Sequence, residues 1–322
     1  MPMNSLRAGY RGRRVVALGG GHGLYATLSA LRILTSNVTA IVTVADDGGS
    51  SGRIREQMDV LPPGDLRMAL SALCDDGEWG QTWRDVLQYR FESSGDLNGH
   101  SVGNLLIVAT WALLDDQIAG LDFIGRLLDI KGRVIPMSST PLEIVADVIT
   151  DGQRKVVTGQ VAVATSKANV ERVQILPENP PAHSEAIDAV HDADWVIFGP
   201  GSWYTSIIPH LLVPDLADSL INTRAKRMLV LNLVPDEETA TCSAASLVEA
   251  FHQHLPQMRL DVILVNSGSV TQWEALQEAA DLVGAQLVRH RLESKNNRAV
   301  HDPLFLAAAF REVFDTFTPR MS

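Results

Sequence analysis

The stretch that decides the fold is Val15-Val16-Ala17-Leu18-Gly19-Gly20-Gly21-His22-Gly23-Leu24. Its four apolar residues have the pattern of a short buried strand, and the glycines that follow predict a turn. Leu24, Leu28, Leu31 and Leu34 then recur at the spacing of one helix face. Residues 38–45 are apolar and rich in β-branched side chains, as in a second strand. Strand, glycine turn, helix and strand in this order predict a parallel βαβ unit.

The same alternation continues along the chain and predicts the fold class. We expect helices over residues 66–73, 81–89, 102–114, 121–128 and 303–317, and strands over 195–198, 228–233, 262–266 and 286–290. Alternating apolar residues around a turn at 151–152 predict an antiparallel β-hairpin insert at about 133–177, with strands over 156–162 and 170–175. The sequence thus predicts a Rossmann-like, doubly wound α/β fold with a mostly parallel sheet and helices on both faces. A disordered leader (1–13), a single domain (14–317) and a tail (318–322) complete the expected organisation.

Composition narrows the classes of function. The chain has 322 residues, of which 46% are hydrophobic and 20% charged, as in an ordinary globular protein. Its formal charge is 27 − 38 = −11, which excludes nonspecific attraction to nucleic acid or to an anionic membrane. No apolar run approaches the roughly 20 residues of a membrane span. Two cysteines without metal-ligand spacing fit a reducing compartment, so we expect a cytoplasmic protein.

The first glycine loop is a candidate phosphate site. Residues 21–26 (Gly-His-Gly-Leu-Tyr-Ala) fit the G-x-G-x-x-G/A pattern of dinucleotide-binding folds. Glycines let the backbone approach phosphate oxygens, and the N-terminus of the following helix supplies N–H donors. A tight turn without a ligand is the alternative. The expected binding residues are Gly19, Gly20, Gly21, His22 and Gly23.

A second polar loop follows the second strand. Asp46 and Asp47 stand about 25 residues after the first loop, where such folds place the acidic residue that binds a ribose. The pair could instead hold Mg²⁺ through its carboxylate oxygens. The residues after this pair indicate a second anion-binding loop: Gly48, Gly49, Ser50, Ser51, Gly52 and Arg53. The same residue types are also common in turns that bind no ligand.

A third loop repeats this chemistry after the strand at 195–198. It mixes glycines with hydroxyl groups, and its expected binding residues are Gly199, Pro200, Gly201, Ser202, Tyr204 and Thr205. Ser202 lies outside a G-x-S-x-G nucleophile elbow, so we assign no catalytic residue.

Two further segments open helices with polar residues. Asp65 is a natural N-cap and Arg67 lies in the first turn after it, where it could also meet phosphate. His100 is either a proton carrier facing the cleft or a structural histidine, and Asn104 follows it one turn later. We expect no metal cluster, and the Walker signature of P-loop NTPases is absent from the sequence.

These motifs together resemble one bacterial family. The resemblance to the YvcK-like gluconeogenesis factors extends from about residue 14 to residue 310. This family carries the following segments in the same order: Gly19-Gly20-Gly21-x-Gly23-Leu24, Thr43-Val44-Ala45-Asp46-Asp47-Gly48-Gly49-Ser50-Ser51-Gly52-Arg53, Pro62-Pro63-Gly64-Asp65-Leu66-Arg67, Gly99-His100-Ser101-Val102-Gly103-Asn104-Leu105-Leu106 and Gly199-Pro200-Gly201-Ser202. His22 departs from the threonine usual in that family, and residues 267–270 lack an expected tyrosine. Arg298 matches a late arginine for the diphosphate or the sugar.

The resemblance implies both a fold and a function. The family has a Rossmann-like core and is distantly similar to the 2-phospho-L-lactate transferases (CofD-like), which move a phospholactyl group from a nucleotide diphosphate carrier to a flavin-like acceptor. YvcK-like proteins are associated with binding UDP-sugars such as UDP-N-acetylglucosamine. They are also associated with cell shape and wall synthesis during gluconeogenic growth.

Three hypotheses follow for this chain. The first is a UDP-sugar-binding regulatory protein without turnover, in which the loops at 19–23 and 199–202 bind the diphosphate. Arg53 and Arg67 would balance its charge, and Asp46, Asp47 and Asn104 would meet hydroxyl groups. The second is a Mg²⁺-dependent transferase acting on a nucleotide-linked donor, and the third, an NAD-dependent oxidoreductase, rests on the glycine pattern alone. We also expect a homodimer, with cell-wall synthesis proteins or a regulatory kinase as further partners.

Overall fold

A parallel sheet forms the centre of the protein. The computed structural model describes residues 12–150, 152–166 and 168–317. Seven strands lie in the order β10-β9-β8-β7-β1-β2-β3, and all their pairings are parallel. Their bounds are β1 (Val15–Gly19), β2 (Val38–Val42), β3 (Arg133–Pro136), β7 (Trp195–Phe198), β8 (Lys226–Val230), β9 (Val262–Asn266) and β10 (Gln286–His290).

The strand order confirms the predicted doubly wound fold. From β1 the chain builds outward through β2 and β3 on one side, then returns to pair β7 with the other side of β1. All five residues of β1 are buried, as expected for a central strand covered on both faces. The direction of winding therefore reverses between β1 and β7, which is where open α/β sheets bind their ligands.

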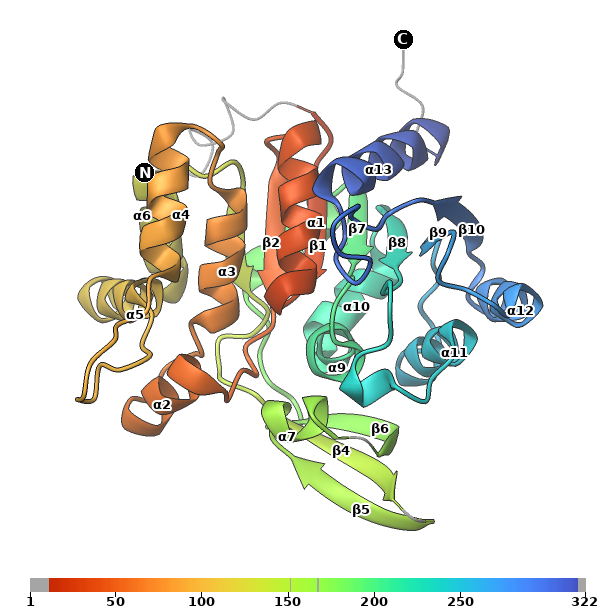
Figure 1. Cartoon of the computed structure of the whole chain (residues 1–322), viewed down its shortest axis with the longest axis horizontal. Coiled ribbons are helices and arrows are strands. Elements are labelled where there is room, and N and C mark those ends of the chain that lie inside the picture. The colour runs from red at the N-terminus through yellow and green to blue at the C-terminus, as the bar shows by residue number, and fades with distance from the viewer. Residues whose placement is uncertain (1–11, 151, 167, 318–322) are drawn as a thin grey trace.

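Helices surround this sheet (Figure 1). They are α1 (Gly21–Leu34), α2 (Gly49–Gln57), α3 (Gly64–Leu73), α4 (Glu78–Gln88), α5 (Val102–Leu114), α6 (Gln117–Leu128), α7 (Gln160–Ala164), α8 (Ser184–Asp192), α9 (Pro209–Leu212), α10 (Pro214–Asn222), α11 (Ala244–His254), α12 (Trp273–Val283) and α13 (Pro303–Phe317). Helix α1 packs between α3 and α13 in front of the strands. Right-handed crossovers place α1 and α10 on opposite faces, because they connect strands that advance in opposite directions. No helix of the described residues has the length and apolar character of a membrane span.

Most predicted elements occur where the sequence placed them. Helices α5 and α13 and strands β7, β9 and β10 have the expected bounds. Strand β2 ends three residues early, at Val42, because the chain turns toward α2. Strand β3 differs in position: we assigned it to the insert, but it pairs with β2 in the main sheet.

The insert is a separate three-stranded antiparallel sheet. Its order is β5-β4-β6, with β4 at Glu143–Thr150, β5 at Gln153–Thr158 and β6 at Asn169–Leu176. The predicted strand over 156–162 is wrong beyond residue 158, where the chain forms the short helix α7. Gly159 makes this change of direction at φ +101°, a conformation that L side chains rarely adopt.

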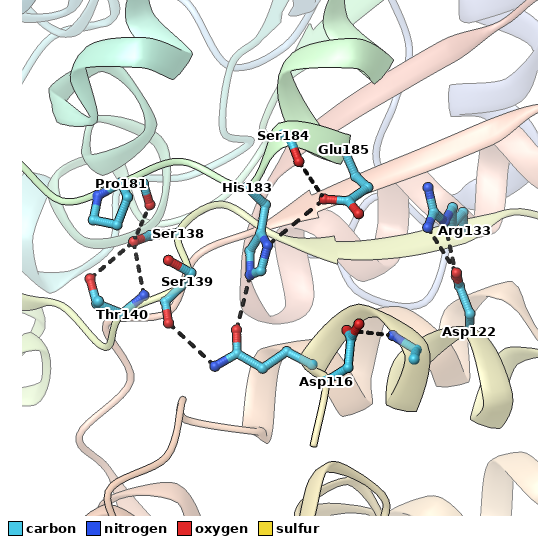
Figure 2. Close-up of polar contacts among 12 residues, drawn as sticks. Asp116, Asp122, Arg133, Ser138, Ser139, Thr140, Pro181, His183, Ser184 and Glu185 are labelled. Atoms are coloured by element: carbon cyan, nitrogen blue, oxygen red, sulfur yellow. Dashed lines mark hydrogen bonds and ion pairs between the residues drawn. The ribbon is translucent and has the colours of Figure 1, made fainter. Parts of the chain in front are cut away.

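Two chain segments connect the insert to the core, and they are held side by side (Figure 2). The Ser138 hydroxyl donates to the Pro181 carbonyl at 2.8 Å, and Ser138 forms a bridge with Ala182. The His183 ring lies 3.0 Å from the Gln117 side-chain oxygen at the start of α6. The Gln117 amide nitrogen donates to the Ser139 carbonyl, so one side chain binds both connecting segments.

The predicted leader and tail lie almost wholly outside the described residues, which begin at residue 12 and end at residue 317. Within the predicted leader, Arg13 contacts the core: its guanidinium binds the Asp315 carboxylate at 3.1 Å, and its carbonyl accepts a hydrogen bond from Thr35. These contacts join the start of the domain to α13.

Candidate functional site

The three predicted loops meet at the carboxyl ends of β1, β2 and β7, on the side of the sheet that faces the insert (Figure 1). A Cβ placed on Gly23 would overlap the Pro200 carbonyl oxygen and lie 2.6 Å from the Gly201 Cα atom. The Thr27 hydroxyl donates to the Gly199 carbonyl at 2.8 Å. The first and third loops are therefore packed backbone against backbone, which only glycine at position 23 permits.

Helix α1 begins at a glycine. Its N-cap residue is Gly20, whose backbone is extended and which has no side chain to act as a cap. His22 is exposed in the first turn. The amide donors of a helix start point along the helix axis, so this end of α1 is a possible anion site.

The Asp65 carboxylate lies against the same loop. A Cβ on Gly20 would overlap Asp65 Oδ2, and the backbone N–H of Gly21 donates to this carboxyl group. Burial and then the charge of Asp46 raise the pKa of Asp65 to about 7, against the opposing effects of the Gly21 hydrogen bond and Arg67. The sequence placed Asp65 as the N-cap of its own helix, but Pro63 is the N-cap of α3 and Asp65 points into the glycine loop.

The second loop contains a helix that the sequence did not predict. Residues 49–57 form α2, whose N-cap Gly48 also has no side-chain cap. Asp46 Oδ1 accepts from the Gly48 N–H at 2.9 Å and fixes this turn. Asp47 Oδ1 accepts from the Val161 N–H at 2.9 Å, so this carboxylate holds the first turn of α7 in the insert.

Behind these loops lies a buried chain of hydrogen bonds. Arg67 Nε donates to Asn104 Oδ1 at 2.9 Å, and Asn104 Nδ2 donates to Ser50 Oγ at 3.0 Å. Ser50 Oγ lies 3.1 Å from His100 Nδ1, within hydrogen-bond distance. The remaining guanidinium contact is with the Gln88 side-chain oxygen.

This network has two consequences. Burial and then the charges of Arg53 and Arg90 lower the pKa of His100, which favours the neutral ring. Burial also lowers the pKa of Arg67 to about 10. The network joins α2, α3 and α5 at their N-terminal turns, so these side chains stabilise the arrangement of the predicted loops.

The third loop is held by two residues that we did not predict from the sequence. Asn232 binds Gly201 twice: its Oδ1 accepts from the Gly201 N–H at 2.9 Å and its Nδ2 donates to the Gly201 carbonyl at 3.0 Å. Glu238 Oε1 accepts from the Tyr204 N–H at 2.9 Å, at the start of a π-helical turn over Trp203–Ile207. Burial and then the charge of Asp236 raise the pKa of Glu238 to about 7. Asn232 lies two residues after the end of β8, and this position near the carboxyl end of a strand is the signal that could have revealed it.

A small pocket adjoins this loop at the ends of β8 and β9. Its cavity volume is about 170 Å³. Its polar wall is formed by Asn232, Ser243, Ser269, Thr271 and Gln272. Apolar side chains such as Leu233 and Val270 complete it, a combination suited to a flat polar ring.

The three loops therefore differ in the donors they offer. In the third loop the N–H groups of Gly201 and Tyr204 already bind Asn232 and Glu238. Helices α1 and α2 both have a glycine as N-cap residue, and they directly follow the neighbouring strands β1 and β2 at the crevice. Their N-termini are thus the two best placed positive ends for a ligand anion.

Arg298 is exposed in the segment between β10 and α13. Within the described residues, no hydrogen bond or ion pair joins it to the other predicted site residues. The segment does return toward the site, because the His301 ring donates a hydrogen bond to the backbone carbonyl of Leu231, directly after β8.

The residues at the crevice fit a magnesium ion bound together with a phosphate ligand. A Cβ on Gly64 would lie 2.5 Å from both Asp46 Oδ2 and Ser51 Oγ, and the charge of Asp46 acts on Asp65. Mg²⁺ commonly takes one or two carboxylates and completes its shell with water and substrate phosphate. In the described residues, no group of three or more histidine, cysteine or acidic side chains is placed to hold a metal by itself.

Comparison with known proteins agrees with this fold. The family model described as 2-phospho-L-lactate transferase CofD matches residues 15–305. A crystal structure of a Bacillus halodurans protein described as a member of the UPF0052 family superposes with a TM-score of 0.84 at 29% identity, covering 94% of this chain and 100% of that one.

Bacterial relatives show to which group within the CofD family the chain belongs. A Mycobacterium tuberculosis protein is 48% identical over 302 residues, covering 91% of this chain and 88% of its own. Proteins named gluconeogenesis factor from Listeria monocytogenes and Bacillus subtilis are 41% and 38% identical over 258 residues. These alignments cover 80% of this chain and 78% and 80% of theirs. The chain therefore belongs to the gluconeogenesis factors of the CofD family.

Proposed function

We propose that this protein binds a nucleotide sugar of the UDP-N-acetylglucosamine type and acts as a regulator without turnover. In this role it links carbon metabolism during gluconeogenic growth to cell-wall synthesis and cell shape. The observation that carries the proposal is the convergence of two helix N-termini with glycine N-caps, α1 and α2, at the point where the strand order reverses. A diphosphate carries two anionic centres, so it matches a pair of positive helix ends.

The ligand lies across the crevice in this proposal. Its diphosphate binds the amides at the starts of α1 and α2, and Arg53 balances part of its charge. Arg53 is half-buried beside the start of α2 and donates to the Asn98 carbonyl at 2.8 Å. The pocket at the ends of β8 and β9 takes the nucleoside ring, and Asn232 lies between the two subsites.

The alternative is a Mg²⁺-dependent transferase acting on a nucleotide-linked donor. The shared space around Asp46 Oδ2 and Ser51 Oγ favours it, as does the description of the matching family model. Asp46, Asp65 and Ser51 would hold the ion, which would neutralise phosphate charge. Asp47 is a weaker ligand candidate than the sequence suggested, because its carboxylate already binds the insert.

Thermal unfolding with a panel of nucleotides distinguishes the regulator hypothesis from the transferase hypothesis. The purified chain is heated with UDP-sugars, UDP, GDP or NAD, with and without Mg²⁺, and the ligand is analysed afterwards. A ligand at about 100 times its dissociation constant adds roughly 2.7 kcal/mol to the native state. We expect a midpoint shift with UDP-N-acetylglucosamine and unchanged ligand. A shift only with GDP and Mg²⁺ would support the transferase, and a shift only with NAD would overturn both proposals.

A matched pair of variants locates the binding. Gly21 has φ +56°, and the nearest atom to an added Cβ is 4.0 Å away, so Gly21→Asn places a side chain in the crevice with little strain. Gly152 has φ +74° with open space around it in the hairpin turn of the insert, so Gly152→Asn is the control. We expect Gly21→Asn to lose the ligand-induced shift and Gly152→Asn to keep it.

A further inference from the structure

Helix α5 is apolar on every side. Its 13 residues include no charged side chain, although 20% of the whole chain is charged. A helix that is hydrophobic all round is expected to be covered all round. Here only one face is buried in the core, through Asn104, Ile107, Val108 and Trp111.

The opposite face of α5 is half-buried in its first two turns, where Leu105 and Leu106 pack against the core, and exposed toward its end. It carries Val102, Leu105, Leu106, Ala109, Ala112 and Leu113. Leu113 is 82% exposed, and Ala109 and Ala112 are also exposed. Figure 1 shows α5 at the edge of the molecule, and its described helix neighbours α3, α4 and α6 contact it from within.

The spacing of this face suits another helix. Residues 102, 105, 109 and 112 alternate steps of three and four, with 106 and 113 beside them, as in helices that pack in pairs. Ala109 stands near the middle of the stripe, where a small side chain lets a second helix axis approach closely. A single apolar stripe of this kind is complementary to itself across a two-fold axis.

Charges at the two ends of α5 identify the orientation. Arg90 is exposed next to the helix start, where its guanidinium binds the Gly99 carbonyl and Tyr89 accepts from the Val102 N–H. Asp115 and Asp116 are exposed at the helix end. An antiparallel copy of α5 would bring Arg90 to the partner's Asp115 and would also oppose the helix dipoles, whereas a parallel copy would align like charges.

We propose that the outer face of α5 is the two-fold interface of a homodimer in which two α5 helices pack antiparallel. The inner face of the same helix holds Asn104 of the buried network, so the dimer would brace the helix that organises the candidate site. This inference stands independently of the ligand that the site binds.

Sedimentation equilibrium of the full chain at micromolar concentration tests the proposal. Ala109 is exposed, so Ala109→Glu leaves the fold of the protomer intact but puts two charges at the centre of the interface. Ala308→Glu, at an exposed alanine of α13, is the matched control. We expect dimers for the wild type and Ala308→Glu and monomers for Ala109→Glu, with equal far-UV circular dichroism. A monomeric wild type, or a dimer that survives Ala109→Glu, would overturn the proposal.

Charge reversal then tests the orientation. Arg90→Glu places like charges at both ends of an antiparallel pair, so it should weaken the dimer at low salt. Adding Asp115→Arg to the same chain restores opposite charges and should recover the dimer. A double variant that dimerises no better than Arg90→Glu alone would contradict the antiparallel arrangement.

Discussion

Asp65 is the site residue whose surroundings in the structure differ most from those expected from the sequence. The sequence offers it as a helix cap, but its carboxyl group lies against the glycine loop that was expected to bind the ligand. In the third loop, the Glu238 carboxyl group likewise accepts a hydrogen bond from the backbone, at the Tyr204 N–H. Two buried acids therefore occupy positions where amide groups of the loops point.

The raised pKa of Asp65 predicts how stability depends on pH. Its pKa is about 7 in the folded chain against an ordinary value of 3.8, so between these values the folded state holds a proton that the unfolded state has lost. The contribution of Asp65 to the unfolding free energy therefore falls as the pH rises from about 4 to about 7 and is constant outside that window. Asp65→Asn cannot ionise, so above pH 7 we expect it to exceed the wild type in stability, by up to about 4 kcal/mol.

Urea unfolding of both proteins at several pH values between 5 and 8 checks this prediction. Asp96→Asn, at an exposed aspartate in the loop before α5, is the control and should follow the wild type. The raised pKa of Glu238 also makes stability fall with rising pH, but Glu238 is present in every variant and does not affect their comparison. If Asp65→Asn kept the pH slope of the wild type, the buried carboxyl group could not be its source.

At the scale of elements, the insert is tied to the core by two side chains as well as by its connecting segments. Asp47 binds the Val161 N–H in α7, and His254 Nε2 in α11 accepts from the Val173 N–H in β6 at 3.2 Å. Helix α7 also contacts the π-helical turn that follows the third loop. The insert thus forms part of the wall around the candidate site.

Asp47→Ala should loosen α7 selectively. It removes the acceptor of the Val161 N–H, a loss typically worth about 1 kcal/mol, which corresponds to roughly fivefold faster amide exchange in residues 160–164. Asp47→Asn keeps a side-chain oxygen as acceptor and should leave exchange nearly unchanged. Hydrogen–deuterium exchange followed by mass spectrometry measures the exchange rate in both variants. Equally faster exchange in Asp47→Ala and Asp47→Asn would show that the negative charge of Asp47, and not its hydrogen bond to Val161, stabilises α7.

At the scale of the whole molecule, the hydrophobic core is continuous. One cluster of buried side chains includes Leu18 of the main sheet, Ile144 and Val173 of the insert, and Phe310 of α13. The Trp195 ring also contacts Phe314 of α13, with centroids 5.0 Å apart, so the last helix is packed on the central sheet. We therefore propose that the predicted single domain, residues 14–317, unfolds as one unit.

Differential scanning calorimetry checks this proposal. A single transition is expected, with a calorimetric enthalpy equal to the van 't Hoff enthalpy. A separate transition of low enthalpy would instead assign the insert to an independent folding unit. Asp47→Ala is the variant most suited to reveal such a transition, because it weakens one of the two side-chain ties.

Several features of the site could be predicted because their signals are local. The glycines at 19–23 and 199–201 stand directly after apolar strands, and the carboxyl ends of parallel strands share one edge of the sheet. Strand β3 was misplaced for the opposite reason: its four residues carry no pattern that tells a main-sheet strand from an insert strand. Asn232 and Glu238 were missed because a single polar residue in a loop shows nothing of the backbone group it will meet.

The sequence by itself determined the βαβ alternation, the parallel sheet and the three polar loops, since apolar periodicity and glycine spacing act within a few residues. Only the tertiary structure decided that Asp47 binds the insert, that Asp65 lies in the first glycine loop, and that α2 is a helix. Each of these depends on a partner that is distant along the chain, such as Val161 for Asp47. Which polar groups remain for a ligand is settled by those partners, because a donor or acceptor already paired inside the fold is not available to another molecule.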